Sequence, residues 1–355
     1  MCMEIKLCAI CKNREANKTN SHIIPSFLVS MVASSDKSYK RYKEILYEIY
    51  GAITKSYIGN EVSPDDVENN FGELSDEELE DYKQTSVARD FIFCSYCEKK
   101  LADLLESPYR NSLFENRKVE THISYFFWLS VIWRMAKFDM LSLKLPTHIV
   151  SAMGKRLNSY IKARDLKGDL SYIMQNLPFD YCIVYCKDYC KVGSGFIYSD
   201  YDKKEKTLLL ILGDVAVYVF FGKTNKFKLA KYYGLANVFS QAKTYKALMK
   251  EQVCNVEISC FEKVSERVVK INQPFVIEEK KKMILNFWKI VKERYMQFLP
   301  NNPSEEFMSV VFNTIYSNEF KVGEKESYKH LAYAFSKALS LVYGVQIIKS
   351  NGELI

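Results

Sequence analysis

Two Cys-x-x-Cys pairs frame the N-terminal third of the chain: Cys8-Ala9-Ile10-Cys11 near its start and Cys94-Ser95-Tyr96-Cys97 at its end. Each pair can place two thiolates on one turn, about 2.3 Å from a shared metal ion. One pair is weak evidence, but two at opposite ends of one module are typical of a tetrahedral zinc site. Cys8, Cys11, Cys94 and Cys97 are therefore predicted to bind Zn²⁺. The alternative is two unrelated pairs of buried thiols.

A histidine motif and an acidic residue accompany these pairs. Ser21-His22-Ile23-Ile24-Pro25 lies between them, and the second pair continues directly into Glu98-Lys99-Lys100. Short strands are expected at 4–10 and 88–94, each delivering one cysteine pair. Residues 26–34 and 98–106 have the pattern of helices. The module thus combines a metal site with a histidine and a carboxylate, the usual groups of acid–base and metal-ion chemistry.

These residues resemble a known family. A Cys-x-x-Cys pair, a His-x-x-Pro strand and a second pair followed by a polar ligand and lysines are similar to the four-cysteine HNH endonucleases, which carry a ββα-metal finger. The resemblance covers roughly residues 5–105. The Ser-His-Ile-Ile-Pro and Cys-x-x-Cys-Glu motifs, with a later helix containing Leu129, Ser130, Trp133 and Arg134, are similar to a group of bacterial HNH-like proteins, some of them in phage-defence settings.

The resemblance implies a metal-dependent endonuclease that hydrolyses nucleic-acid phosphodiesters, with a role in antiviral defence. His22 takes the position of the general base, and Glu98 that of a ligand to a catalytic Mg²⁺ or Mn²⁺. Asp90 or Arg89 takes the position of the group that orients the histidine. The zinc ion is then structural, and holds the hairpin and the helix of the finger together.

Three features depart from the family pattern. Ser21 stands where an acidic or histidine ligand is usual, and no Asn precedes Cys94 at the usual place. The separation between His22 and Cys94 is also much longer than in a compact finger, because an acidic insertion at about 40–85 interrupts the motif. The missing acid predicts a weakly held catalytic metal.

Composition and the pattern of apolar residues predict the fold of the rest of the chain. Its 355 residues allow two domains, and 48% of them are hydrophobic. Apolar helices are expected at 121–143 and 147–164, short β-like runs at about 180–221, and helices at 278–298, 303–318 and 325–343. The predicted fold class is α+β, in which a zinc-stapled ββα-metal finger is followed by a mainly helical core, a small β-sheet and a C-terminal helical segment at about 278–343. The predicted domains are residues 1–118 and 119–355.

The most apolar run, Ile123 to Trp133, is too short to span a membrane, and the start of the chain has no signal-peptide pattern. We therefore expect a cytoplasmic protein without a membrane partner, whose ten cysteines are metal ligands or buried thiols rather than disulfides. Cys182, Cys186 and Cys190 recur every four residues, which favours one packed face over a second metal site. Arg134 lies in an apolar helix, so it should pair with an acid of the finger, such as Glu98 or Glu106.

The net charge of +7 is compatible with a nucleic-acid partner, and DNA is favoured over RNA. Six lysines interleaved with aromatic residues are candidate phosphate contacts, the alternative being a solvated amphipathic face: Lys223, Lys226, Lys228, Lys231, Lys243 and Lys246.

Two other functions stay open. One is a non-catalytic zinc adaptor that binds nucleic acid or protein. The other is a ribonuclease of the helical HEPN type, because Arg117 and His122 form an R-x4-H motif that resembles its signature. A protein partner or a second copy of the chain is also compatible with the sequence.

Overall fold

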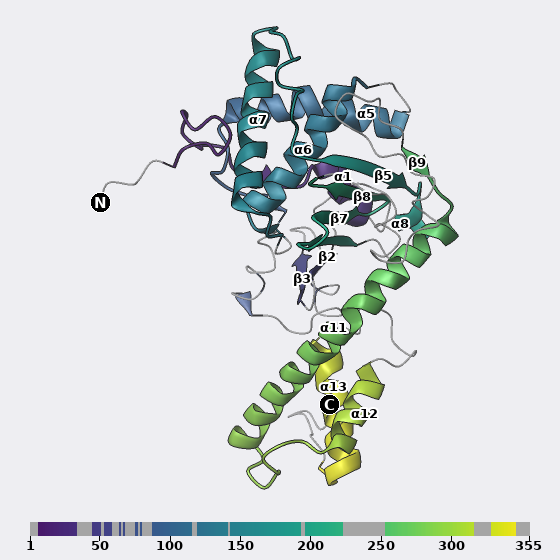
Figure 1. Cartoon of the computed structure of the whole chain (residues 1–355). Helices are drawn as coiled ribbons and strands as arrows, with labels where there is room; N and C mark the ends of the chain where they lie inside the picture. Colours follow the sequence, from purple (N-terminus) through teal and green to yellow (C-terminus); the bar gives the residue numbers. More distant parts are fainter. Residues whose placement is uncertain are drawn as a thin grey trace, which may run out of the picture.

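The computed structural model describes residues 6–33, 45–50, 53–58, 87–115, 119–140, 143–192, 196–222, 253–315 and 328–345, with isolated positions between 64 and 79. The fold is mixed α+β, as predicted (Figure 1). No helix in these ranges is both long and apolar enough to cross a bilayer. The predicted lysines at 223–246 and Arg117 lie outside the described residues, as do most of the acidic residues of the insertion.

The N-terminal region, residues 6–33 and 87–115, is called the finger below and consists of very short strands and several helices. Strand β1 pairs antiparallel with β4, so that Ser21 lies opposite Arg89 and His22 opposite Ala88. The expected strands are shorter than predicted: the described part of 4–10 contributes an isolated bridge between Leu7 and Glu15, and 88–94 contributes a strand at 88–89. The elements of this region are β1 (Ser21–His22), α1 (Ser26–Ala33), β4 (Ala88–Arg89), α4 (Ser95–Leu101), the π-helix η2 (Ala102–Glu106) and α5 (Ser107–Glu115).

A seven-stranded sheet lies beside the helical core, in the order β3-β2-β6-β7-β8-β5-β9. It extends beyond the predicted range of about 180–221, because the hairpin at 45–58, within the predicted insertion, adds two strands and β2 runs parallel to β6. Its strands are β2 (Ile45–Tyr50), β3 (Ile53–Ile58), β5 (Asp180–Tyr185), β6 (Ile197–Asp202), β7 (Thr207–Leu212), β8 (Val215–Phe220) and β9 (Cys254–Asn255); the short helix α8 (Tyr189–Val192) follows β5.

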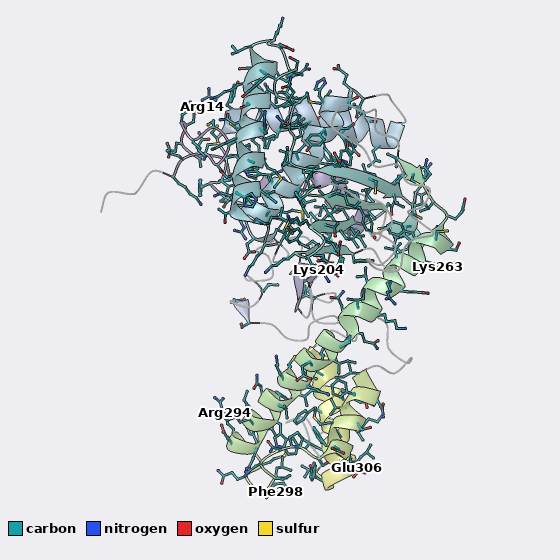
Figure 2. The ribbon with its side chains drawn as sticks, in the orientation of Figure 1. Arg14, Lys204, Lys263, Arg294, Phe298 and Glu306 are labelled. Atoms are coloured by element: carbon teal, nitrogen blue, oxygen red, sulfur yellow. The ribbon has the colours of Figure 1, made fainter. Side chains whose placement is uncertain are left out.

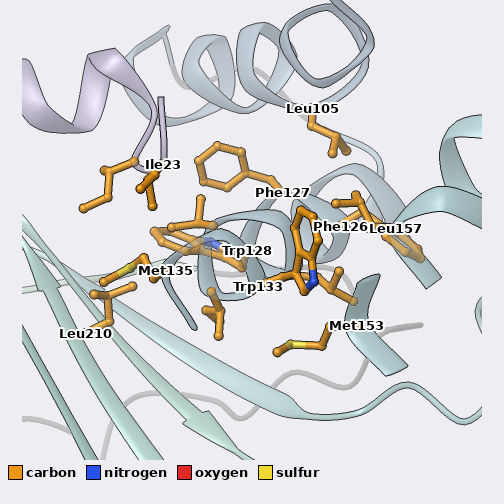
Figure 3. Close-up of a cluster of buried hydrophobic side chains, with 14 of the residues drawn as sticks. Ile23, Leu105, Phe126, Phe127, Trp128, Trp133, Met135, Met153, Leu157 and Leu210 are labelled. Carbon is orange, nitrogen blue, oxygen red and sulfur yellow. The ribbon is translucent and has the colours of Figure 1, made fainter. Parts of the chain in front are cut away.

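Helix α6 (Thr121–Lys137) is the centre of the main core. It ends six residues before the predicted 143, where Asp139 adopts a left-handed backbone conformation. Figure 3 shows its aromatic side chains between Ile23 of the finger, Leu157 of α7 (Thr147–Asp165) and Leu210 of the sheet. The same buried cluster runs from the finger to the sheet across residue 118, so the division into two domains stays a prediction.

The two faces of the sheet pack against different helices, because successive residues of a strand point to opposite sides. One face joins the α6 cluster. The other, with Cys182 and Cys186, packs against Phe261, Val264 and Val268 of α11 (Ile258–Arg294). The predicted packed face of cysteines is confirmed.

Helix α11 begins twenty residues before the predicted 278 and leads away from the sheet to a C-terminal lobe (Figure 1). Its first half packs on the sheet, and its second half packs on α12 (Glu305–Ile315) and α13 (Tyr328–Tyr343). Apolar residues on both sides of Pro274 explain why the helix continues through a residue that removes one backbone hydrogen bond.

Candidate metal centre and the polar network beside it

The four predicted cysteines converge. The sulfur atoms of Cys8, Cys11, Cys94 and Cys97 all lie within 4.8 Å of one another, and those of Cys11 and Cys94 are 3.9 Å apart. A tetrahedron with metal–sulfur bonds of about 2.3 Å has edges of about 3.8 Å, so the spacing suits a single zinc ion. The sequence prediction that these four residues can bind zinc is supported by this geometry.

Local backbone structure positions the sulfurs. Lys12 has a left-handed backbone (φ 57°) and donates its N–H to the Cys8 carbonyl at 2.9 Å, which closes the first turn. Cys94 caps helix α4, and its sulfur accepts the N–H of Cys97 at 3.5 Å. Such N–H groups at a helix start favour a thiolate over a thiol.

The pKa values of the cysteine thiols also favour the binding of a cation among them. The Cys97 thiol, hydrogen-bonded to Cys8, lowers the pKa of Cys8 to about 4, although burial opposes this. The same interaction and burial raise the pKa of Cys97, and burial raises that of Cys94. Without a positive ion, one of the four cysteines therefore loses its proton easily, and the deprotonation of a second cysteine is unfavourable. A bound zinc ion would let all four sulfurs be thiolates.

A second polar group surrounds the guanidinium of Arg134, which is only 1% exposed. Its Nη1 donates to the carbonyl of His22 at 2.8 Å and lies 2.9 Å from Oε1 of Glu106. Its Nε and Nη2 donate to Ser130, to the carbonyl at 3.2 Å and the hydroxyl at 3.3 Å. The predicted pairing of Arg134 with an acid of the finger is confirmed, and the partner is Glu106.

Glu98 lies beside this group. Burial raises its pKa, the positive charge of Arg134 acts in the opposite direction, and the nearby Glu106 carboxylate raises it further. Ser21 is fully buried, and its hydroxyl is near enough to lower the pKa of Glu98. Even so, neither the Ser21 hydroxyl nor Oε2 of Glu98, both buried, has a partner at hydrogen-bonding distance and angle. The buried carboxylate oxygen of Glu98 therefore lacks the proton donor or cation that it requires, and the Ser21 hydroxyl beside it lacks a fixed partner.

The π-helix η2 explains why Glu98 and Glu106 interact. Eight residues of α-helix turn through two full turns and about 80° more, which would place these two carboxylates on different faces. Five residues of the wider π-helix remove most of that excess rotation. Glu106 therefore returns to the face of Glu98 and pairs with Arg134, whose charge also acts on Glu98.

The other predicted site residues are placed as follows. His22 is half-buried on β1, and its backbone carbonyl is held by Arg134. Asp90 is exposed, and its Oδ1 accepts the N–H of Asn20 at 2.6 Å, so it fixes the turn that precedes β1. The role of Asp90 in orienting the histidine stays a prediction.

A catalytic divalent ion would have Glu98 as its protein ligand, with Ser21 nearby. In the described ranges, the four cysteines are the one group of three or more ligands that lie close enough together to bind an ion. A Mg²⁺ ion is commonly held by one or two carboxylates plus water and substrate phosphate, so Glu98 suits such a site in its chemistry but would provide only part of it.

His122 of the R-x4-H motif lies at the start of α6. Its Nδ1 is 3.3 Å from the Glu120 carboxylate and its ring is 5.8 Å from that of Tyr160. Burial lowers its pKa, Glu120 opposes this and Arg164 adds to it. This is the environment of a histidine packed against a core, and the ribonuclease alternative stays untested because Arg117 is not described.

Sequence reasoning did not single out Lys18 and Phe91. Lys18 lowers the pKa of Glu98, and its backbone pairs with the Phe91–Phe93 segment. Neither residue belongs to a recognisable motif, so only the spatial arrangement identifies them. Comparisons of the chain with protein-family models, with curated proteins and with solved structures found no match.

Proposed function

We propose that this protein is a metal-dependent endonuclease of the HNH-like type, in which His22 is the general base and Glu98 a ligand of the catalytic Mg²⁺ or Mn²⁺. The observation that carries the proposal is the convergence on one buried guanidinium. Arg134 contacts the His22 carbonyl and Glu106, and its charge acts on Glu98. The histidine motif and the residue after the last cysteine thus belong to one polar network, as the family resemblance requires.

The order of elements also supports the proposal. A strand pair carries His22, and a helix that starts at the second cysteine pair carries Glu98. A ββα-metal finger would have its elements in this order, with the four-sulfur cluster at its base, and zinc would stabilise its fold and take no part in the reaction. Four sulfur ligands would fill every coordination position of a structural zinc ion, so the ion would have no position left for water or substrate.

The residues would act in distinct ways. The imidazole of His22 would accept a proton from the water that attacks phosphorus, a role that histidine takes more often than any other side chain. Arg134 would keep β1 in place through the His22 carbonyl. A divalent ion bound at Glu98 would supply stabilisation of the charge that develops on the phosphate and the leaving oxygen. Because Ser21 replaces an acidic ligand, we expect cleavage to require high concentrations of Mg²⁺ or Mn²⁺.

Plasmid nicking tests the proposal. Native protein should convert supercoiled plasmid to open circles with Mg²⁺ or Mn²⁺, and His22→Ala should lower the rate by at least about 100-fold. The matched control is His148→Ala, because His148 is an exposed histidine on α7, and this variant should cut like the native protein. Zinc content should be equal in all three. If His22→Ala cuts as fast as the native protein, His22 is not the base, and His122 becomes the next candidate.

One observation favours the alternative of a zinc adaptor without catalytic activity. The cysteines are the one closely spaced ligand set in the described part of the chain. An adaptor would bind nucleic acid or protein with no effect of Mg²⁺ or Mn²⁺, and native protein would leave both plasmid and RNA intact at every metal concentration.

A further inference from the structure

The outer surface of the finger carries an exposed aromatic ring in an unusual backbone position. Phe91 is 50% exposed and has a left-handed backbone, with φ +55°. A bulky residue seldom adopts this conformation, because its Cβ crowds the backbone. Its N–H donates to the Lys18 carbonyl at 2.8 Å, and Lys18 in turn donates to the Phe93 carbonyl at 3.0 Å, so the backbone is held at both sides. The chain therefore presents this ring to solvent on a fixed support.

The surface near Phe91 is basic. Lys18 and Arg89 are exposed, and Lys18 lies close enough to Glu98 to lower its pKa. The exposed acid among them, Asp90, is engaged by the N–H of Asn20. Along the sequence, the two finger segments 6–20 and 87–100 contain seven basic residues and three acids, and of the basic residues Lys100 is paired with Asp165 of α7: Lys6, Lys12, Arg14, Lys18, Arg89, Lys99 and Lys100, against Glu15, Asp90 and Glu98. Figure 2 labels Arg14 at the outer edge of this finger.

The backbone of Phe91 is also close to that of His22. Phe91 follows Ala88 by three residues, a distance of at most about 10 Å along an extended chain, and Ala88 is the strand partner of His22. That distance corresponds to roughly three steps of a nucleic-acid strand with a rise of 3.4 Å. A strand that contacts Phe91 could thus pass Lys18 and present a phosphodiester to the region of His22 and Glu98.

We infer that Phe91, with Lys18 and Arg89, forms a docking surface for a nucleic-acid strand with unpaired bases, in which the Phe91 ring stacks on one base. Positive charge complements phosphate, and an exposed ring on a basic surface is the arrangement that binds single strands through stacking. The choice of a nucleic acid rests on the proposed function. The inference adds the substrate class: single strands, or duplexes in which a base is unpaired.

Binding measurements test this independently of cleavage. The probe is a labelled single-stranded DNA oligonucleotide of mixed sequence, containing one 2-aminopurine, and the comparison is the same strand in a full duplex. The protein is the full chain with His22→Ala and without added Mg²⁺ or Mn²⁺, so that no cleavage can occur. We expect tighter binding to the single strand than to the duplex, and quenching of the 2-aminopurine fluorescence by stacking.

Replacing the ring should remove both signals. Phe91→Ala should weaken single-strand binding by about tenfold and abolish the quenching, while Phe91→Trp should keep both. Lys18→Ala and Arg89→Ala should each lower the slope of log affinity against log salt by about 0.7. The matched control is Tyr172→Ala, since Tyr172 is 75% exposed with Arg156 beside its ring but lies outside the finger. A variant whose finger does not fold will purify with less zinc than the native protein. If Phe91→Ala loses zinc, Phe91→Gly takes its place in the experiment.

Several results would overturn the inference: equal affinity for strand and duplex, unchanged binding by Phe91→Ala, or a change in self-association of that variant in sedimentation, which would show that the ring contacts a second copy. Cleavage by the native protein with no effect of Phe91→Ala would leave the proposed function intact and remove only this surface. Binding that depends on Phe91, in a protein that cleaves no nucleic acid, would support this surface and contradict the proposed function.

Discussion

The N-terminal finger and the C-terminal lobe are stabilised in opposite ways. In the lobe, aromatic side chains pack edge to face: the rings of Trp288 and Phe307 are 4.8 Å apart, and those of Phe307 and Phe335 are 4.9 Å apart. No charged side chain is buried among its described residues. The finger instead buries the thiols of Cys8, Cys94 and Cys97 and the hydroxyl of Ser21, and it packs against the buried guanidinium of Arg134 on α6. The lobe follows the rules of a stable core, whereas the finger keeps groups whose burial costs free energy.

This difference indicates where function lies. Proteins tend to break the rules of stability at functional sites and to compensate elsewhere. In the finger the compensation is the expected zinc ion and the network around Arg134. Among its described residues the lobe buries no charge, and the hydroxyl of Ser336 is its one buried side-chain group without a hydrogen-bond partner, so we expect it to contribute stability or a partner surface rather than chemistry.

The largest expected effect is the loss of zinc. Structural zinc contributes an apparent 10–16 kcal/mol, on the order of the whole folding free energy of a small module. Cys97→Ala should therefore lose the metal and unfold the finger, so that hydrogen exchange loses protection at 6–33 and 87–101. The lobe at 284–343 should keep its protection, because its core contains no sulfur ligand.

Two variants control this experiment. Cys254→Ala changes a cysteine outside the cluster and should keep one zinc ion per chain. Leu339→Ala leaves a cavity in the lobe and should cost about 2–5 kcal/mol there with zinc retained. A protein that purifies without zinc, or a Cys97→Ala variant that keeps a full equivalent, would contradict the assignment.

The second effect concerns Arg134. Arg134→Leu leaves the Glu106 carboxylate and the His22 carbonyl without their buried partner, and such a loss typically costs about 3–5 kcal/mol. Thermal unfolding followed by tryptophan fluorescence and circular dichroism measures it. Glu106→Gln keeps an acceptor for the guanidinium but removes the charge, and should cost less. Equal melting of Arg134→Leu and native protein would show that the network does not join finger and core.

The sequence predicted the sheet and the sulfur cluster better than the polar network. Strand β7 covers 207–212, within the predicted range of about 180–221, because Thr207 and the five apolar residues that follow it lie between turn residues. The cysteine spacing predicted the cluster, since ligand chemistry depends on few residues. The position of Glu106 depends on a π-helix, whose extra residue per hydrogen-bonded ring leaves no trace in hydrophobic periodicity. The hairpin at 45–58 was missed because the region was interpreted as an acidic insertion, although Ile45–Tyr50 is itself rich in β-forming residues.

The smallest expected effect concerns one residue in each region that has a left-handed backbone. After α13, the lobe places Gly344 in the left-handed conformation (φ +65°), where its N–H reaches the Ser340 carbonyl at 3.1 Å. Glycine suits this position because it has no Cβ. The finger places Phe91 in the same conformation, at φ +55°. If stability alone had determined both residues, both would be glycine.

Paired substitutions measure this contrast. Phe91→Gly and Phe91→Ala both lack the ring, so the difference between their free energies of unfolding reports the cost of the left-handed backbone. The glycine variant should be more stable by about 1 kcal/mol. At position 344, Gly344→Ala should lose about the same amount. Chemical denaturation with zinc present measures both. Phe91→Gly should thus gain backbone stability relative to Phe91→Ala and yet bind single-stranded DNA equally poorly, because both lack the ring. If the two variants at position 91 are equally stable, the backbone there is not strained, and the exposed ring needs no functional explanation.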